Sequence, residues 1–401
     1  MEPVVTLTHQ ELGVKQELFM FSEVSPGSCF LLPRGARIYN KLIDFLRREY
    51  LIRGYDEVIT PNIANTKLWI PSGHWDKYKE NMFCFQCDDL DYSLTPMNCP
   101  KHALIYKSKI HSYRELPIRL ADFGVLHRNE LHGALTGLTR VRRFCQDDAH
   151  IFCRIDQIES EIKSVLEFIR DVYLIFGFPM TIGLSTRPEK YIGSLDVWNL
   201  AEATLKQTLE SLKLPYVLKE GDGAFYGPKI DIHIEDALNR KHQCATVQLD
   251  FNLPERFELE YVTSVQDKPE RPVMIHRAIL GSVERFFAIL CEHTQGKWPF
   301  WISPRQVSVI PIKPQHQNFA ENLRKELAKN GFYCDVDISD ETMDKRVVRA
   351  KNDQYNYIIV IGNREVTNNS LAVRKRDSNE AVNISVSEFL DQCRNLSENK
   401  K

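Results

Sequence analysis

The sequence contains no run of about 18 apolar residues, the length that a membrane-spanning helix requires. It also opens without a charged and then apolar leader that ends in small residues, so we expect a soluble cytoplasmic protein with no membrane partner. Two nucleotide-binding fingerprints, G-x-G-x-x-G and G-x-x-x-x-G-K-[ST], are also missing. A nucleotide site in this chain must therefore be built from other residues.

Three further absences narrow the class of protein. The net charge is only −2 at pH 7, so there is no global electrostatic attraction to nucleic acid. No H-E-x-x-H motif occurs, which argues against a zinc hydrolase. The pair Cys84 and Cys87 has no second pair at zinc-finger spacing, so we interpret it as a turn between strands. The ten cysteines are mostly scattered in apolar surroundings, a pattern typical of a reducing compartment.

The chain of 401 residues is long enough for two well-buried cores. Apolar residues recur at helical spacing from residue 36 to 53, and a strand is expected to follow and to end at Pro61. Prolines and tryptophans between 297 and 305 mark a boundary, and strands alternate with helices beyond it, with a turn expected at 364–366. We therefore expect one domain over residues 1–303 and a smaller α/β domain, with a mostly parallel sheet, over residues 304–401.

Residues 123–152 carry the densest group of chemically useful side chains. Two apolar runs flank a polar loop, which predicts two strands, and alternate side chains of a strand point the same way. Arg128 and Glu130 then share one face, and so do Gln146, Asp148 and His150. An arginine, an aromatic ring and a glutamate suit a nucleotide. A carboxylate beside a histidine suits a small cationic substrate next to a metal.

Cys99, His150 and His276 are far apart in the sequence, but each is expected at the edge of a strand. Cys99 falls in the turn of TPMNCPKH, and His276 ends the strand VMIH. One thiolate and two imidazoles provide three ligands for a zinc ion and leave a position open. A single cysteine is more often part of a core, so the prediction depends on all three residues meeting.

Three features in order resemble the signature motifs of class II aminoacyl-tRNA synthetases: the helix and strand ending at Pro61, the Arg128-x-Glu130 and Arg140-x-x-x-Phe144 pair, and Gly281-x-x-x-Arg285. A finer resemblance, from about residue 15 to the end, is to the threonyl-tRNA synthetase family. It is carried by PSGHW, TPMNCP, FGVLHRNE, QDDAHIF, STRPE, GAFYGPKI, TVQLDF and IHRAILGSVER. It implies an α+β catalytic domain on an antiparallel sheet flanked by helices, then an anticodon-binding domain, without the family's N-terminal editing region.

The resemblance implies a reaction in which ATP and L-threonine give threonyl-adenylate, and a terminal ribose hydroxyl of tRNA(Thr) then takes the threonyl group. It implies Mg²⁺ with ATP, a homodimer formed through the first motif, and contacts with the acceptor end and the anticodon of the tRNA. His74, Arg128 and Arg285 match residues that act in catalysis, and a histidine that titrates near neutrality suits a general base. The ATP-binding residues implied are Arg128, Glu130, Arg140, Phe144, Gln243, Thr246, Ser282 and Arg285.

The same resemblance assigns the remaining site residues. Zinc would bind the amino and hydroxyl groups of threonine, with Cys99, His150 and His276 as its ligands. The threonine-binding residues implied are Met97, Asp148, Tyr226, Lys229 and Gln248, and the anticodon-binding residues are Glu365 and Arg374.

The chain also departs from the family pattern. Lys101 stands where the family usually has glycine, and His132 replaces a small residue in the loop of the second motif. One alternative is a non-catalytic regulator that resembles a synthetase and binds RNA or senses an amino acid. Such proteins typically lose motif arginines or metal ligands, and all of these residues are present here.

Overall fold

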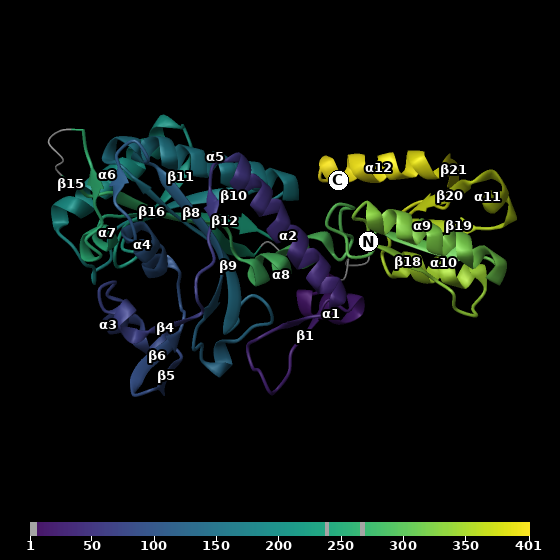
Figure 1. The fold of residues 1–401 in the computed structure, drawn as a ribbon, viewed down its shortest axis with the longest axis horizontal. Helices are drawn as coiled ribbons and strands as arrows, with labels where there is room; N and C mark the ends of the chain where they lie inside the picture. Colours follow the sequence, from purple (N-terminus) through teal and green to yellow (C-terminus); the bar gives the residue numbers. More distant parts are fainter. Residues whose placement is uncertain (1–5, 237–239, 265–268) are drawn as a thin grey trace. The chain divides into compact units, whose positions relative to one another are not determined.

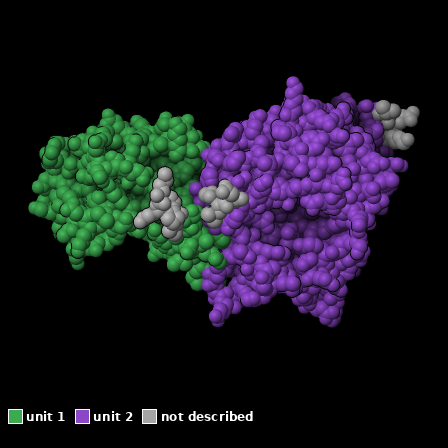
Figure 2. All heavy atoms as spheres, turned by 180° about the vertical axis from the view of Figure 1, so that it is seen from behind, with its two compact units in different colours: residues 1–20, 30–42, 294–401 green, residues 21–29, 43–293 purple. Residues whose placement is uncertain are grey.

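The computed structural model describes residues 6–236, 240–264 and 269–401 (Figure 1). The chain divides into two compact units (Figure 2). The larger unit contains residues 21–29 and 43–293, and the smaller one contains the described part of residues 1–20 together with residues 30–42 and 294–401. Within the described residues, every helix is too short or too polar to cross a bilayer.

The larger unit is built on an eight-stranded sheet with the order β11-β10-β12-β13-β16-β9-β8-β3. The six central strands pair antiparallel, and β11 and β3 join in parallel at the edges. This confirms the expected α+β fold. The strands are β3 (Asp56–Glu57), β8 (Ile118–His127), β9 (Arg143–Cys153), β10 (Met180–Ser185), β11 (Tyr216–Lys219), β12 (Lys229–Glu235), β13 (Lys241–Asp250) and β16 (Val273–Ser282).

The two faces of this sheet are covered by different helices. Helix α5 (Ile158–Phe176) buries Ile162, Val165 and Ile169, whose spacing of three and four residues forms one apolar stripe. Phe168 of α5 lies 5.7 Å from the Arg277 guanidinium, so Arg277 points to the α5 face. Because neighbouring side chains of a strand alternate, His276 points to the opposite face. That opposite face also receives α4 (Cys99–Lys107) and α7 (Asn252–Arg256).

The remaining elements of the larger unit are short apart from α8. They are α3 (His74–Tyr78), β4 (Ile63–Asn65), β5 (Cys84–Cys87), β6 (Leu90–Leu94), β7 (His111–Ser112), β14 (Tyr261–Val262), β15 (Pro269–Glu270), α8 (Val283–Thr294) and the 3₁₀ turns η1 (Thr66–Trp69), η2 (Lys79–Asn81), η3 (His132–Ala134) and η4 (Ile155–Gln157). Helix α6 (Leu195–Ser211) packs beside α5.

Two expectations about this region are wrong in detail. Helix α2 (Pro33–Ile52) forms as predicted and is followed by Gly54 at φ 71°, but strand β3 covers only two residues instead of reaching Pro61. The Cys84–Cys87 segment is a strand, not a turn, because it pairs with β6. The reversal falls one step later, at Asp88 and Asp89, which both have positive φ.

The smaller unit contains a five-stranded sheet with the order β18-β17-β19-β20-β21. Strands β17, β18 and β19 are parallel, as expected, and β20 and β21 add antiparallel partners at one edge. The segment 363–368, where a turn was predicted, is helical. The elements are α1 (His9–Gln16), β1 (Phe19–Met20), β2 (Phe30–Leu31), β17 (Val307–Pro311), η5 (Pro314–His316), α9 (Gln317–Lys329), β18 (Cys334–Val336), α10 (Met343–Asn352), β19 (Tyr357–Ile361), α11 (Asn363–Asn368), β20 (Ser370–Lys375), β21 (Ala381–Ser385) and α12 (Val386–Glu398).

Candidate active site and metal centre

Strand register gathers distant parts of the sequence on one face of the large sheet. Strands β12, β13, β16 and β9 are consecutive neighbours, so residues paired across them form rows. Two adjacent rows result, one of Lys229, Gln248, His276 and His150 and the other of Asp231, Thr246, Ala278 and Asp148. Most of the residues in these rows were predicted for threonine, ATP or zinc.

Cys99, His150 and His276 form a compact cluster of possible metal ligands. One ligand atom from each residue lies within 4.8 Å of the others, and all three side chains are buried. Zinc bonds of about 2.0–2.3 Å place tetrahedral ligands within a few ångströms of each other, so the cluster has a suitable size. Two details differ from the sequence prediction. Cys99 is the first residue of α4, and His276 lies inside β16 rather than at its end.

The ring of His276 is oriented by a carboxylate. Its Nε2 lies 2.9 Å from Oδ2 of Asp250. The other oxygen of Asp250 accepts backbone N–H groups from Asn252 at 2.7 Å and Leu253 at 3.0 Å, which fixes the carboxylate. Donation from Nε2 leaves Nδ1 of His276 as the nitrogen for a metal, the arrangement that metal-binding histidines usually adopt.

A second histidine orients His150. His102 lies one helical turn after Cys99 on α4, and its Nδ1 is 2.7 Å from Nδ1 of His150. Nε2 of His102 faces Oδ2 of Asp122 at 3.7 Å, and that oxygen accepts from the hydroxyl of Thr60 at 2.5 Å. Nε2 of His150 is buried and has no hydrogen-bond partner among the described residues. The unused nitrogen of His150 is therefore available to a metal.

The electrostatics of the cluster also fit a cation. Burial, reinforced by the neighbouring His102, lowers the pKa of His150 well below its ordinary value, so the ring is neutral as a ligand must be. Burial raises the pKa of the Cys99 thiol well above its ordinary value, and the nearby carboxyl group of Asp148 is the second cause. A cation is what such a thiol needs to become a thiolate. One sulfur and two imidazole nitrogens form a donor set that suits Zn²⁺.

A cavity of 290 Å³ opens onto the cluster. Four of the residues predicted for threonine line it, namely Met97, Asp148, Tyr226 and Gln248. The hydroxyl of Tyr226 donates to Oε1 of Gln248, and Oδ2 of Asp148 accepts from the amide of Asn98 at 3.3 Å. The cavity thus combines a carboxylate, a phenol and an amide beside a possible metal.

His74 lines the same cavity and is only 3% exposed. Burial is the main cause that lowers the pKa of His74 to about 3, and electrostatic interaction with His276 and then with Arg128 contributes. This differs from the near-neutral titration expected from the sequence, because the ring is desolvated and lies near cations. Its Nδ1 has no hydrogen-bond partner within the described chain, so a neutral imidazole faces the site.

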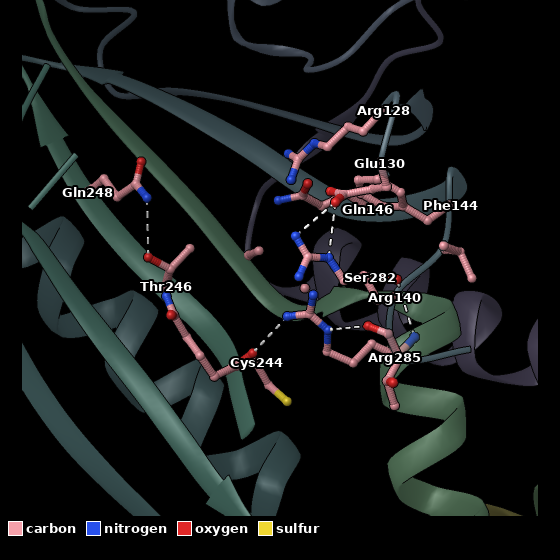
Figure 3. Close-up of a pocket in the computed structure, with 15 residues that line it drawn as sticks. Arg128, Glu130, Arg140, Phe144, Gln146, Cys244, Thr246, Gln248, Ser282 and Arg285 are labelled. Carbon is pink, nitrogen blue, oxygen red and sulfur yellow. Dashed lines mark hydrogen bonds and ion pairs between the residues drawn. The ribbon is translucent and has the colours of Figure 1, made fainter. Parts of the chain in front are cut away.

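A second cavity, of 490 Å³, lies beside the first (Figure 3). All eight residues predicted for ATP line it: Arg128, Glu130, Arg140, Phe144, Gln243, Thr246, Ser282 and Arg285. Figure 3 shows Thr246 and Gln248 along one side, with Arg128, Glu130 and Phe144 across from them. Four residues line both cavities, namely Arg128, Gln146, Thr246 and Gln248, so the two spaces adjoin.

The arginines of the larger cavity are held by specific contacts. The guanidinium of Arg128 lies 5.0 Å from the Phe144 ring. Arg140 donates from Nε to Glu130 at 3.0 Å, and Arg285 donates from Nε to the carbonyl of Thr139 at 3.2 Å. Three cationic side chains therefore converge on a space large enough for a nucleotide.

Asp147 explains how Arg285 reaches this cavity. The pairing of β16 with β9 shifts register between Ala278 and Ser282. Across this shift, the carboxylate of Asp147 accepts the backbone N–H groups of Ile279, Leu280 and Gly281 at 2.8, 3.0 and 2.8 Å. These hydrogen bonds to Asp147 of β9 hold the bulge in place, and the bulge determines where α8 begins.

Three predicted residues do not contribute to the lining of either cavity. Lys229 is absent from their lining, and its ammonium lies 2.9 Å from Oδ2 of Asp231. Glu365 and Arg374 belong to the smaller unit. Glu365 accepts the backbone N–H of Gly362 at 2.8 Å, and Arg374 lies on β20 opposite Ile358.

Several lining or supporting residues were missed by the sequence interpretation. Gln146 was predicted to share a strand face with Asp148 and His150 but was not assigned to a site, although this position already indicated one. His102, Asp231 and Asp250 gave no such signal, since their roles depend on partners in other elements.

Family models match both parts of the chain. Residues 83–294 match the tRNA synthetase class II core domain (G, H, P, S and T), and residues 306–396 match an anticodon binding domain. The chain thus contains a class II tRNA synthetase core followed by an anticodon binding domain.

Individual relatives identify the family within this class. The chain is similar to the RNA binding domain of threonyl-tRNA synthetase from Cryptosporidium parvum, with a TM-score of 0.95 and 49% identity over 97% of this chain and 98% of that one. It therefore belongs to the threonyl-tRNA synthetase family.

Curated relatives are longer than this chain. The cytoplasmic threonine–tRNA ligase of Saccharomyces cerevisiae is 56% identical over 98% of this chain and 54% of the relative. Threonine–tRNA ligase 1, cytoplasmic, of Homo sapiens is 53% identical over 97% of this chain and 54% of the relative. The chain thus spans about half the length of the curated relatives it matches.

Proposed function

We propose that the protein is a threonine–tRNA ligase, which uses ATP to join L-threonine to tRNA(Thr) through threonyl-adenylate. The observation that carries the proposal is the junction of the two cavities. Arg128 lines both the space beside the Cys99, His150 and His276 cluster and the space lined by the ATP residues. An amino acid and a nucleotide bound there would meet at one guanidinium.

In the first step, a carboxylate oxygen of threonine attacks the α-phosphorus of ATP, and pyrophosphate leaves. Arg128 can hold the carboxylate and the α-phosphate with the two sides of its planar guanidinium. Arg285, from the start of α8, adds positive charge where the polyphosphate would lie. Catalysis of this step rests on positioning and on cations near the developing negative charge, with Mg²⁺ bound to ATP.

Cys99, His150 and His276 would hold a Zn²⁺ ion, which supplies coordination sites for the amino and hydroxyl groups of threonine. Asp148 would accept an N–H of the threonine amino group, and Tyr226 and Gln248 complete the polar wall. Shape alone separates isosteric amino acids by only about a hundredfold, so selection against valine needs a group that requires the hydroxyl. Met97 limits the pocket on its apolar side.

In the second step, the terminal ribose hydroxyl of the tRNA attacks the carbonyl carbon of the adenylate, and AMP leaves. His74 has an unpartnered Nδ1 in the described structure, so it can accept a hydrogen bond from this hydroxyl and orient it for the attack. In the smaller unit, which includes the proposed anticodon-binding domain from residue 304, Glu365 and Arg374 would contact the anticodon. We place the protein in the cytoplasm, in line with the names of several of its relatives.

Threonine-dependent exchange of labelled pyrophosphate into ATP tests the proposal. We expect exchange with threonine, Mg²⁺ and Zn²⁺, and much slower exchange when valine replaces threonine. Absence of exchange from a protein that still binds threonine and tRNA would favour the non-catalytic regulator instead.

The homodimer through the first motif is a separate proposal. Leu51 and Ile52 at the end of α2 are 79% and 73% exposed in the single chain, and Ile59 is 92% exposed. A group of large apolar side chains near one another in the sequence and open to water is typical of a protein interface.

Substitution of Ile59 by aspartate should convert the dimer to a monomer, because a charge would be buried in the apolar interface. Sedimentation equilibrium measures the mass directly. Ile338→Asp is the matched control, since Ile338 is 61% exposed but lies in the smaller unit, and it should leave the dimer intact. A monomeric wild-type protein would contradict the proposal.

A further inference from the structure

Asp231 is fully buried, and four side chains contact its carboxylate. Its Oδ2 lies 2.9 Å from Nζ of Lys229 and 3.0 Å from the hydroxyl of Ser185. Its Oδ1 accepts from the amide of Gln243 at 2.5 Å and from the hydroxyl of Thr246 at 3.4 Å. Neither cavity has Asp231 in its lining, yet Gln243 and Thr246 both line the larger one.

These contacts fix the direction of hydrogen bonding in the adjoining strand. An ionised carboxylate only accepts, so the amide of Gln243 must donate its N–H and leave its oxygen for another partner. The hydroxyl of Thr246 likewise gives its single hydrogen to Asp231. The oxygen of Thr246 can then only accept, and Nε2 of Gln248 lies 3.5 Å from it.

The hydrogen bonds keep the same direction of donation in the smaller cavity. With Nε2 of Gln248 directed to Thr246, Oε1 of Gln248 is left to accept, and it receives the hydroxyl of Tyr226. The lone pairs of the Tyr226 oxygen then remain for a donor in the cavity, such as the N–H of an amino group. An ordered chain of hydrogen bonds thus runs from Tyr226 through Gln248 and Thr246 to Asp231.

We propose that Asp231 is a positioning residue that sets the donor and acceptor pattern presented to both substrates, to ATP through Gln243 and Thr246 and to threonine through Gln248 and Tyr226. This inference rests on the proposed function of the two cavities. It also gives Lys229 a role other than direct contact with threonine. Its ammonium supplies the positive charge that a buried carboxylate needs.

The variant Asp231→Asn tests the proposal, because it keeps the size of the side chain but introduces a donor. Equilibrium dialysis should show the affinities for threonine and for ATP both falling by about tenfold or more, the range expected for lost hydrogen bonds to a charged group. Bound zinc should remain unchanged. Ser185→Ala is the control, since it removes a partner of Asp231 outside the chain of hydrogen bonds, and both affinities should stay within about twofold of wild type.

A double-mutant cycle separates positioning from loss of folding. Thr246→Val breaks the chain between Asp231 and Gln248, whereas Thr246→Ser keeps the hydroxyl and should restore threonine affinity. In the Thr246→Val background, Asp231→Asn should no longer lower threonine affinity, because its effect passes through Thr246. Additive effects, or a fall in only one of the two affinities in Asp231→Asn, would overturn the inference. A wild-type protein that binds neither substrate would instead refute the proposed function.

Discussion

Replacement of Cys99 by serine is expected to reduce bound zinc from about one ion per chain to nearly none, and to weaken threonine binding by more than a hundredfold. Changes in the groups that only orient metal ligands already cost about 10–100-fold in metal affinity, and Cys99 is itself a proposed ligand. Its thiol lies within 4.8 Å of the histidine nitrogens, and a serine hydroxyl is a far poorer ligand for Zn²⁺ at neutral pH. Elemental analysis of the purified protein and equilibrium dialysis with threonine measure the two quantities.

Cys153→Ser provides the matched control. Cys153 is also fully buried, and it lies on β9 three residues after His150, outside the ligand cluster. This variant should keep its zinc and its threonine affinity even if its folding stability falls. The metal assignment is wrong if Cys99→Ser retains both properties. Anomalous scattering at the zinc edge should place one ion between Cys99, His150 and His276.

The second large effect is expected from Arg128→Lys, which should lower the rate of pyrophosphate exchange by about 10²–10³-fold, the cost of removing a preorganised donor from a developing charge. Lysine keeps the positive charge but loses the planar fork that can hold two oxyanions at once. Arg128 also packs 5.0 Å from the Phe144 ring, a contact that suits a flat guanidinium. Exchange kinetics at saturating threonine and ATP isolate the loss in the reaction step from any loss in binding.

Arg143→Lys is the corresponding control on β9. Arg143 pairs with Glu284 at 3.1 Å and is absent from the lining of both cavities. Its replacement should change exchange by no more than a few-fold, as expected for a partly exposed ion pair. A rate for Arg128→Lys within tenfold of wild type would show that the guanidinium does not bridge the substrates.

The sequence grouped the residues of the larger cavity correctly because several of them lie in contiguous motifs, and the binding of ATP there stays a prediction. Arg128 and Glu130 precede the loop and Phe144 follows it, so one hairpin brings them together, and the structure places all eight predicted residues around one cavity. The three possible zinc ligands were found by residue type and resemblance. Strand register places His276 opposite His150, and helix α4 brings Cys99 to them, and no local pattern in the sequence contains either relation.

The predictions were less accurate where tertiary pairing overrides local signals. The run ending at Pro61 looked like one strand, but only Asp56 and Glu57 pair with β8. The segment Cys84–Cys87 has no strong strand pattern, but it forms a strand because it pairs with β6. His102, Asp231 and Asp250 escaped notice because their partners come from other elements.

The three possible ligands come from two parts of the fold. His150 and His276 face each other on the paired strands β9 and β16, and Asp250 also holds the ring of His276. Cys99 comes from helix α4, whose His102 contacts the ring of His150. A displacement of α4 would therefore remove Cys99 from two histidines that stay together, and would also remove His102 from His150. Rigid packing of α4 against Phe152 and Met274 is thus a condition for tight metal binding.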